Sequence, residues 1–332
     1  MKFSIIVPCY NLAPWIQQCL DSVASQDFKD WECVVIDDES TDDSGQILDE
    51  YARRDSRFKI IHQKNAGEGG ARNTGLSVAK GEWIFFLDGD DLMLPTALAQ
   101  LVECITEDDK IIRFKYTAFD DGTCPNIQSE TVPSQVRLVD ISQEIRMEDF
   151  YTYVWQHVYR RSVTDGLKFR RYIRGCDRVY LSEVLLERVD EVKVVDCVCY
   201  GYRKRAGSAM NSVPSRQVLC DEMDHRLDII EMIDTSGKKV DYAGNIWLEG
   251  YFTVMFYQIA KRLSARKDVV YDWRCRLNRL RKCIGLSKYG RFVVWACGEA
   301  QCVACDFLLC YVIPRFRDGG SPIRALKRKL FK

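Results

Sequence analysis

The sequence predicts an α/β protein with a mostly parallel sheet flanked by helices, followed by a helical C-terminal extension. Three observations lead to this prediction. Over the first hundred residues, short apolar runs alternate with segments of helical periodicity. The apolar runs are continuous, which is typical of strands that are buried on both faces of a parallel sheet. From about residue 215 onward the pattern is helical.

The elements of the first hundred residues follow a regular order. Strands are predicted at 2–8, 32–37, 58–62 and 82–87, and helices between them at 14–25, 44–53 and 70–80. Pro14 suits the first turn of a helix, and Gly81 stands where a helix end favours a left-handed residue. Later in the chain we predict strands at 110–119 and 192–199, a loop at 120–135 and a helix at 177–187. We place a domain boundary near residue 212, so that residues 1–212 form the α/β domain and 213–332 a helical region.

Composition narrows the class of protein. Lys and Arg together number 48, as do Asp and Glu, so the formal net charge of the 332-residue chain is zero. Proteins that bind nucleic acid usually carry a basic excess, so no nucleic-acid partner is expected.

The apolar run at the N-terminus is too short for a signal peptide. We therefore expect a cytoplasmic chain whose 15 cysteines are reduced, several of them packed in the core.

The segment 292–313 is apolar around most of a helical circumference, with Glu299 and Asp306 on one face. It falls short of the roughly 18 uncharged apolar residues of a spanning helix. Basic residues follow it: Arg315, Arg317, Arg324, Lys327, Arg328, Lys329 and Lys332. Two interpretations remain open. Either a buried helix precedes a solvated basic tail, or residues 292–332 make a peripheral contact with the inner face of the cell membrane.

Polar residues follow each of the four predicted N-terminal strands. Because ligands of such sheets bind at the carboxyl ends of the strands, these residues are expected to meet at one edge. They are Pro8, Tyr10 and Asn11 after the first strand, Asp37 and Asp38 after the second, Gly67 to Arg72 after the third, and Asp88, Asp90 and Asp91 after the fourth.

This set of residue types suits a nucleoside diphosphate. Asp88 and Asp90 project to the same side of a strand end, where paired carboxylates favour Mn²⁺ or Mg²⁺. The glycines from Gly67 onward let the backbone approach a diphosphate at a helix N-terminus, and Arg72 adds a charged fork. Asp38 could accept an N–H from a base. Each feature also has an ordinary alternative, such as a chance acidic pair, a tight turn, a helix cap or a solvated arginine.

Four segments carry a resemblance to a known family. SIIVPCYN (4–11), VVIDDESTDDS (34–44), NAGEGGARNTGL (65–76) and GEWIFFLDGDDLMLP (81–95) resemble, in this order, the inverting glycosyltransferases of family 2. The resemblance implies the Rossmann-like GT-A fold. It implies that Asp38, with Pro8 and Tyr10, holds the nucleoside, usually uridine, and that Asp88 contacts the ribose or metal region. Asp90 would be the metal ligand, and Asn11, Gly67 and Arg72 lie within the same donor-binding segments.

Later segments resemble the bacterial surface-polysaccharide branch of that family. RGCDRVYL (174–181) is similar to its Gly-Glu-Asp-x-x-Phe element, which implies that Asp177 is the general base. Cys176 replaces the glutamate of that element and Tyr180 its phenylalanine. YGYRKRAGSAMNS (200–212) is similar to a segment whose basic residues, here including Arg205, could close over the diphosphate. A basic surface loop is the alternative for this stretch.

The resemblance implies a hexosyl- or N-acetylhexosaminyltransferase that uses a UDP-sugar donor and Mn²⁺ or Mg²⁺. Its acceptor would be a hydroxyl of a glycan or lipid-linked glycan, in surface-polysaccharide synthesis. Residues 1–100 would bind the donor, and 101–212 would carry the acceptor side and the base. The alternatives are a catalytically inactive nucleotide-binding scaffold of the same fold or a sugar nucleotidyltransferase. A sugar nucleotidyltransferase would require a basic glycine-rich loop after the first strand, where this chain has VPCYNLAPW.

Overall fold

The computed structural model describes residues 1–125, 135–141, 153–205 and 216–236. The chain divides into two compact units, Met1–Pro214 and Ser215–Lys332. The first unit carries the sheet and the candidate site. In the second, the described element is α8 (Arg216–Thr235), within the region predicted to be helical. The segment 292–332 lies outside the described residues, and none of the described helices is both long enough and apolar enough to cross a membrane.

The N-terminal half of the sheet is parallel, as the alternation of strands and helices predicts. Its strands lie in the order β3-β2-β1-β4. Their bounds are Phe3–Cys9 for β1, Trp31–Asp37 for β2, Phe58–His62 for β3 and Trp83–Phe86 for β4. The connecting helices are α1 (Ala13–Ala24), α2 (Ser44–Arg54) and α3 (Gly67–Val78). α3 begins three residues before the predicted start, so the glycines near Gly67 form its first turn.

The other half of the sheet makes it mixed. β8 (His157–Arg160) lies antiparallel between β4 and β6 (Ile111–Asp120), and β6 pairs in parallel with β9 (Glu191–Lys204). The short strands β5 (Leu92–Met93) and β7 (Val136–Asp140) both pair antiparallel with β9. The antiparallel pairs let segments far apart in sequence, such as those after β4 and in β9, meet at the edge where β1 and β2 end.

The remaining helical elements are short. α4 (Ala97–Cys104) follows β5, the 3₁₀ turn η1 (Val154–Gln156) precedes β8, and α6 (Arg161–Thr164) follows it. α7 (Cys176–Glu183) continues into a π-helical turn, η2 (Val184–Arg188). α7 and η2 together cover the whole of the single helix predicted at 177–187 and extend it by one residue at each end.

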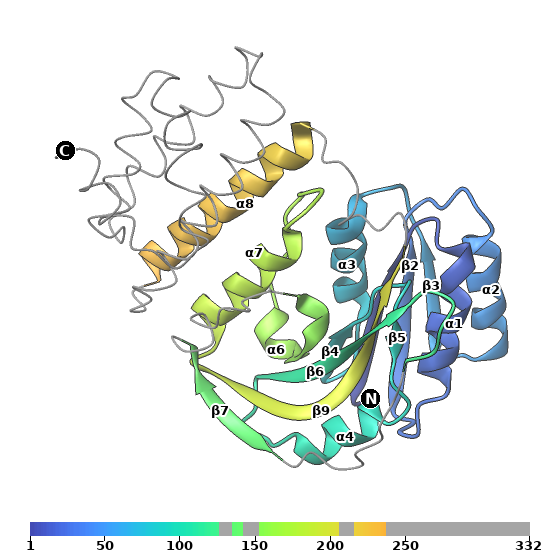
Figure 1. Cartoon of the computed structure of the whole chain (residues 1–332), viewed down its shortest axis with the longest axis horizontal. Helices are drawn as coiled ribbons and strands as arrows, with labels where there is room; N and C mark the ends of the chain where they lie inside the picture. The colour runs from blue at the N-terminus through green and yellow to red at the C-terminus, as the bar shows by residue number, and fades with distance from the viewer. Residues whose placement is uncertain (126–134, 142–152, 206–215, 237–332) are drawn as a thin grey trace, which may run out of the picture. The chain divides into compact units, whose positions relative to one another are not determined.

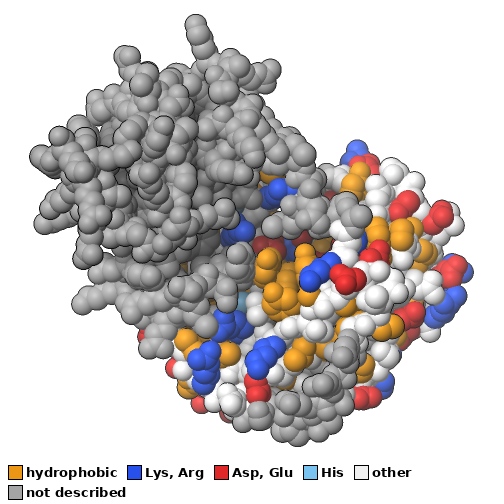
Figure 2. All heavy atoms as spheres, in the orientation of Figure 1, with side chains coloured by type: hydrophobic (Ala, Val, Ile, Leu, Met, Phe, Trp, Pro, Cys, Tyr) orange, Lys and Arg blue, Asp and Glu red, His pale blue; other side chains and the backbone are white. Residues whose placement is uncertain are grey.

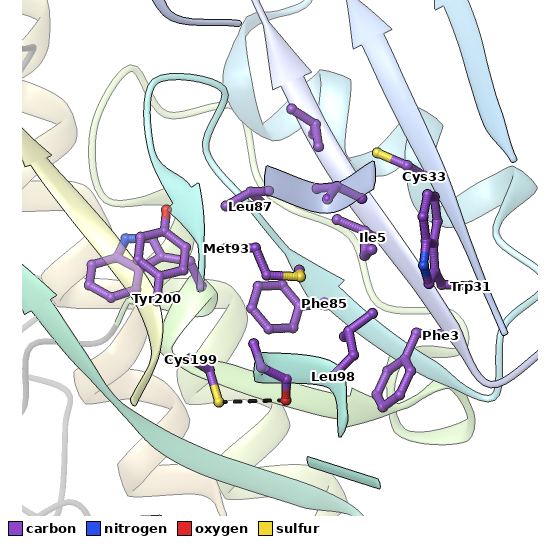
Figure 3. Packing of buried hydrophobic residues seen from close by; sticks show 14 of the residues in the cluster. Phe3, Ile5, Trp31, Cys33, Phe85, Leu87, Met93, Leu98, Cys199 and Tyr200 are labelled. Atoms are coloured by element: carbon purple, nitrogen blue, oxygen red, sulfur yellow. Dashed lines mark hydrogen bonds between the residues drawn. The ribbon is translucent and has the colours of Figure 1, made fainter. Parts of the chain in front are cut away.

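Helices cover both faces of the sheet (Figure 1). Alternate residues of β1, including Phe3 and Ile5, join one buried cluster with apolar residues of α1, α2 and α4. Figure 3 shows Phe3, Ile5, Phe85 and Leu98 in this cluster, which extends to Tyr200 on β9. Burying each such side chain contributes roughly 1.5–3 kcal/mol, so this cluster fixes the strands whose ends form the site.

Cysteines serve as packing residues in the first unit. Eight of the 15 are described as free thiols, and seven of these are buried: Cys9, Cys19, Cys33, Cys104, Cys176, Cys197 and Cys199. Burial raises the pKa of the Cys104 thiol to about 11 and that of Cys9 to about 12. These thiols stay protonated and behave as small apolar groups, as the sequence predicts.

On the face shown in Figure 2, basic and acidic side chains are intermixed beside a group of hydrophobic side chains. Charged side chains of both signs therefore border the hydrophobic group on the described part of this face.

Close packing of α3 on the sheet gives a test of the fold. A Cβ at Gly75 would lie 2.4 Å from Ile6 Cγ2 and 3.0 Å from Ile36 Cδ1. We expect Gly75→Ala to lower the free energy of unfolding by about 1–3 kcal/mol through overpacking. Urea unfolding measured by tryptophan fluorescence checks this. Gly201→Ala is the control, because its Cβ would meet nothing closer than 3.4 Å. An equal effect of both substitutions would contradict this packing.

Candidate active site

The turns after β1 and β2 are held against each other. Asn11 has a left-handed backbone, with φ of 53°, and its Oδ1 accepts the N–H of Thr41 at 2.7 Å. Pro8 is buried at the end of β1, whereas Tyr10 is 50% exposed. Pro8, Tyr10 and Asn11 therefore lie where sequence analysis placed them, beside the end of β2. The ring of Tyr10 is open to a ligand.

Asp38 follows β2 and is buried, with one carboxylate oxygen committed to the fold. Its Oδ1 accepts hydrogen bonds from Gln63 Nε2 at 2.7 Å and from the N–H of Ala66 at 2.9 Å. The other oxygen, Oδ2, has no hydrogen-bond partner among the residues that the structure describes. Asp38 thus orders the start of α3 and keeps one acceptor for a donor such as the N–H of a base.

The first turn of α3 depends on two glycines. Gly67 has φ of 74°, a conformation that favours glycine. Gly69 lets the segment before α7 approach, since a Cβ there would lie 3.0 Å from the Cβ of Phe169 and 3.5 Å from that of Cys176. This close approach brings α7, and with it Asp177, to the side chains of α3.

Arg72 lies at the centre of the candidate site and is completely buried. Its Nη1 donates to Asp177 Oδ1 at 2.5 Å, and its Nη2 donates to Asp88 Oδ1 at 2.7 Å and to Glu68. Its guanidinium carbon also lies 5.4 Å from the centroid of the Phe169 ring. One arginine on α3 therefore connects the first turn of that helix, the residue Asp88 after β4 and the start of α7.

This position differs from the diphosphate clamp that sequence analysis expected of Arg72. Both terminal nitrogens donate to carboxylates, and the buried Nε has no hydrogen-bond partner among the described residues. A buried guanidinium needs such carboxylates to offset its lost hydration. Arg72 thus positions the acidic groups around it instead of facing a ligand. The sequence pattern could not show that Asp88 and Asp177 would be its partners, because the packing of the fold brings them together.

Asp177 has one carboxylate oxygen that is held and one that is open. Oδ1 accepts from Arg72, and the thiol of Cys176 lies 3.5 Å from the same atom. Oδ2 has no hydrogen-bond partner within the described ranges. Burial raises the pKa of Asp177 to about 6 and the nearby Arg72 opposes this rise, while Glu68 adds to it. Such a carboxylate is ionised at neutral pH and can accept a proton.

The three acidic residues after β4 have different environments. Asp88 bonds to Arg72, and burial raises its pKa to about 8 against the opposing effect of that arginine. Asp91 is buried away from the others, accepting the Tyr200 hydroxyl at 2.6 Å and the N–H of Arg203 at 2.7 Å. Asp91 therefore anchors the loop to β9, while Asp88 and Asp90 stay partly exposed.

β9 continues five residues beyond its predicted end at Cys199. Tyr200 receives the N–H of Asp88 at 3.2 Å, and Arg203, also buried, donates from Nε to the carbonyl of Asp90 at 2.7 Å. These partners lie more than a hundred residues away in sequence, so the local pattern gives no sign of them. Arg205, just past the strand, donates from Nε to Asp90 Oδ2 at 2.7 Å.

Asp88 and Asp90 offer the donor set that a hard divalent cation requires. Each side chain is 23% exposed. Asp88 Oδ2 and Asp90 Oδ1 have no hydrogen-bond partners in the part of the chain that the structure describes. No three side chains of His, Cys, Asp and Glu in that part gather to hold an ion. A cation here would therefore take its other ligands from diphosphate and water.

Sequence reasoning missed three participants. Glu68 pairs with Arg72 one helical turn away, and its spacing of four residues is a signal that could have been read. Tyr200 and Phe169 are far from the site in sequence: Tyr200 accepts the N–H of Asp88, and the Phe169 ring packs against Arg72. Phe169 also stacks on Tyr180 with ring centroids 4.0 Å apart, which fixes α7 beside α3.

Comparisons with known proteins agree with this arrangement. The family profile described as glycosyl transferase family 2 matches residues 4–167. EpsJ of Bacillus subtilis (strain 168), an uncharacterized glycosyltransferase, is 31% identical over 227 residues, which are 66% of this chain and 66% of EpsJ. The chain belongs to glycosyltransferase family 2. Glycosyltransferase GlyA of Streptococcus pneumoniae serotype 4 is 29% identical over 241 residues, 69% of this chain but only 34% of GlyA.

Solved structures share the fold. S. aureus TarS 1–349, crystallised in complex with UDP-GlcNAc, gives a TM-score of 0.73 at 22% identity, covering 96% of this chain and 92% of that one. The mannosyltransferase PcManGT from Pyrobaculum calidifontis, in complex with GDP-Man and Mn²⁺, gives 0.51 at 17% identity, covering 93% and 87%. The α/β unit of this family 2 glycosyltransferase thus has the GT-A fold, as the sequence resemblance implies.

Removing Arg72 tests its role in the glycosyltransferase fold. We expect Arg72→Gln to lower the free energy of unfolding by about 3–5 kcal/mol at pH 8, because buried carboxylates lose their counter-charge. The loss should be smaller at pH 5. The folded-state pKa values of Asp88 and Asp177 are already raised, and without Arg72 they rise further, so acid neutralises these groups in the folded state.

Urea unfolding of both proteins at the two pH values measures this. Arg54→Gln is the control, because Arg54 forms an exposed pair with Glu50 whose loss should cost at most about 0.5 kcal/mol. A penalty for Arg72→Gln that does not change with pH would show that the carboxylates do not depend on this arginine.

Proposed function

We propose that this glycosyltransferase is an inverting, metal-dependent enzyme that transfers a sugar from a UDP-sugar to a hydroxyl of a glycan or lipid-linked glycan. One observation carries the proposal. Through a single guanidinium, Arg72 joins the carboxylate after β4, on the donor side, to Asp177 at the start of α7. A donor site and a candidate base thus share one rigid network.

The donor is proposed to bind at the ends of β1 and β2. The open Oδ2 of Asp38 would accept the ring N–H of uracil, and the exposed face of Tyr10 would stack on the base. Pro8, Asn11 and Gly67 shape the same edge of the sheet. A UDP-sugar is preferred because TarS, which is similar in fold, was crystallised with UDP-GlcNAc.

The leaving diphosphate would lie beside Asp88 and Asp90. A divalent cation bound there would supply positive charge to the leaving UDP. From the β9 side, Arg205 contacts this acidic pair directly through its hydrogen bond to Asp90. The backbone of Asp88 is fixed by Tyr200, so the pair would hold such a cation in place to offset the negative charge that develops as the bond to UDP breaks.

Asp177 would act as the general base. Its open Oδ2 takes the proton of the acceptor hydroxyl as that oxygen forms a bond to the anomeric carbon and the bond to UDP breaks. Arg72 holds the other oxygen and keeps the carboxylate oriented. Attack opposite the leaving group inverts the anomeric configuration. The acceptor class rests on the resemblance to the surface-polysaccharide branch, and the membrane contact of 292–332 stays a prediction.

Asp177→Asn tests the assignment of the base. With UDP-GlcNAc as donor and water as acceptor, we expect the rate of UDP release to fall by about 10²–10⁴-fold, while the affinity for UDP is kept. The wild-type rate should rise with pH through about 6, as Asp177 loses its proton. UDP release coupled to a colorimetric assay, with calorimetry for UDP, provides both measurements.

Asp165→Asn is the matched control, because Asp165 is an exposed aspartate at the end of α6. It should leave rate and affinity unchanged. Unaltered UDP release by Asp177→Asn, or a wild-type rate that does not depend on pH between 5 and 8, would show that Asp177 is not the base.

A further inference from the structure

Arg205 occupies the carboxylate that is proposed to bind the metal. Its Nε lies 2.7 Å from Asp90 Oδ2, and the two side chains are only 16% and 23% exposed. Its guanidinium carbon also lies 4.4 Å from the centroid of the Trp15 ring. The positively charged side chain of Arg205 thus holds Asp90, and the face of the Trp15 ring lies against its guanidinium. Both contacts are favourable for a guanidinium.

The place that Arg205 takes is built by other side chains. Trp15 Nε1 donates to Asp121 Oδ1 at 3.1 Å, and Arg203 Nη1 donates to the same oxygen at 3.0 Å. Arg203 in turn fixes the backbone of Asp90. The aromatic ring and the carboxylate that hold Arg205 are therefore connected to each other through Asp121 and Arg203, and they keep a fixed separation.

A metal ion on the open Oδ1 of Asp90 would share this carboxylate with Arg205, which holds Oδ2, so two cations would compete for one negative charge. Without nucleotide, a bound metal ion would therefore weaken the contact between Arg205 and Asp90. A nucleotide diphosphate changes this balance, because its oxygens offer Arg205 another anion at the same edge. Trp15 would keep the displaced guanidinium near that anion.

We propose that Arg205 is an internal counter-ion of Asp90, which makes binding of the divalent cation conditional on binding of the nucleotide. This inference rests on the proposed function, since it takes Asp90 as the metal ligand. It adds a regulatory property to that site. The metal competes with Arg205 for Asp90, and UDP offers Arg205 another anion, so metal and UDP bind cooperatively. Linkage requires the same coupling factor in both directions.

The test is binding of Mn²⁺ by the full chain, measured from the EPR signal of free Mn²⁺ with and without saturating UDP. For the wild type we expect weak binding of Mn²⁺ alone and binding at least about tenfold tighter with UDP. For Arg205→Gln we expect binding of Mn²⁺ alone to tighten by about fivefold to tenfold, since a charge-assisted hydrogen bond no longer opposes it. The gain from UDP should shrink by a similar factor.

Lys204→Gln is the matched control. It removes the same charge one residue away, from an exposed side chain. Equal tightening by both substitutions would reduce the effect to long-range charge and overturn the proposal, as would no tightening by Arg205→Gln. Trp15→Leu is a second variant, which loosens Arg205 without removing its charge and should tighten Mn²⁺ binding to a smaller extent. No binding of Mn²⁺ by the wild type even with UDP would instead overturn the metal site of the proposed function.

Discussion

The arrangement of the site depends on one buried arginine. Arg72 is completely enclosed, and such a guanidinium is tolerated only with carboxylates around it. Its partners come from three places: Glu68 on α3, Asp88 after β4 and Asp177 on α7. Glycine at position 69 lets the last of these approach. The requirement to neutralise one charge thus joins the parallel half of the sheet to the helix that carries the proposed base.

The second constraint comes from β9, which holds the loop after β4 from the other side. Asp91, Tyr200 and Arg203 are buried together, and they fix the backbone of Asp88 and Asp90 while leaving the carboxylates of these two residues partly exposed. The acidic cluster is therefore divided by function within four residues. One carboxylate anchors the loop, one meets Arg72 and one meets Arg205, which explains how like charges so close together are stabilised.

The parallel half of the sheet and the position of each strand end could be predicted from the sequence, because continuous apolar runs and local turn residues determine them. The strand-end residues Asp38, Asp88 and Asp90 were found in this way. Strands near β6 and β9 were predicted, but the antiparallel pairing of this half of the sheet and the contact of Arg72 with Asp177 could not be. β8 is only four residues long, and the contacts of Arg72 with Asp177 and of Asp91 with Tyr200 span 105 and 109 residues. Such contacts are decided by packing and leave no local pattern.

The most direct test of this account is the thermal stability of the full chain with UDP, GDP, CDP and ADP, each with and without Mn²⁺. A ligand that binds only the folded state stabilises it by about 2.7 kcal/mol at a hundred times its Kd. We expect a raised melting temperature with UDP that requires Mn²⁺ and is lost in Asp90→Asn. No shift with any nucleotide, or a metal-dependent shift with another nucleotide alone, would contradict it.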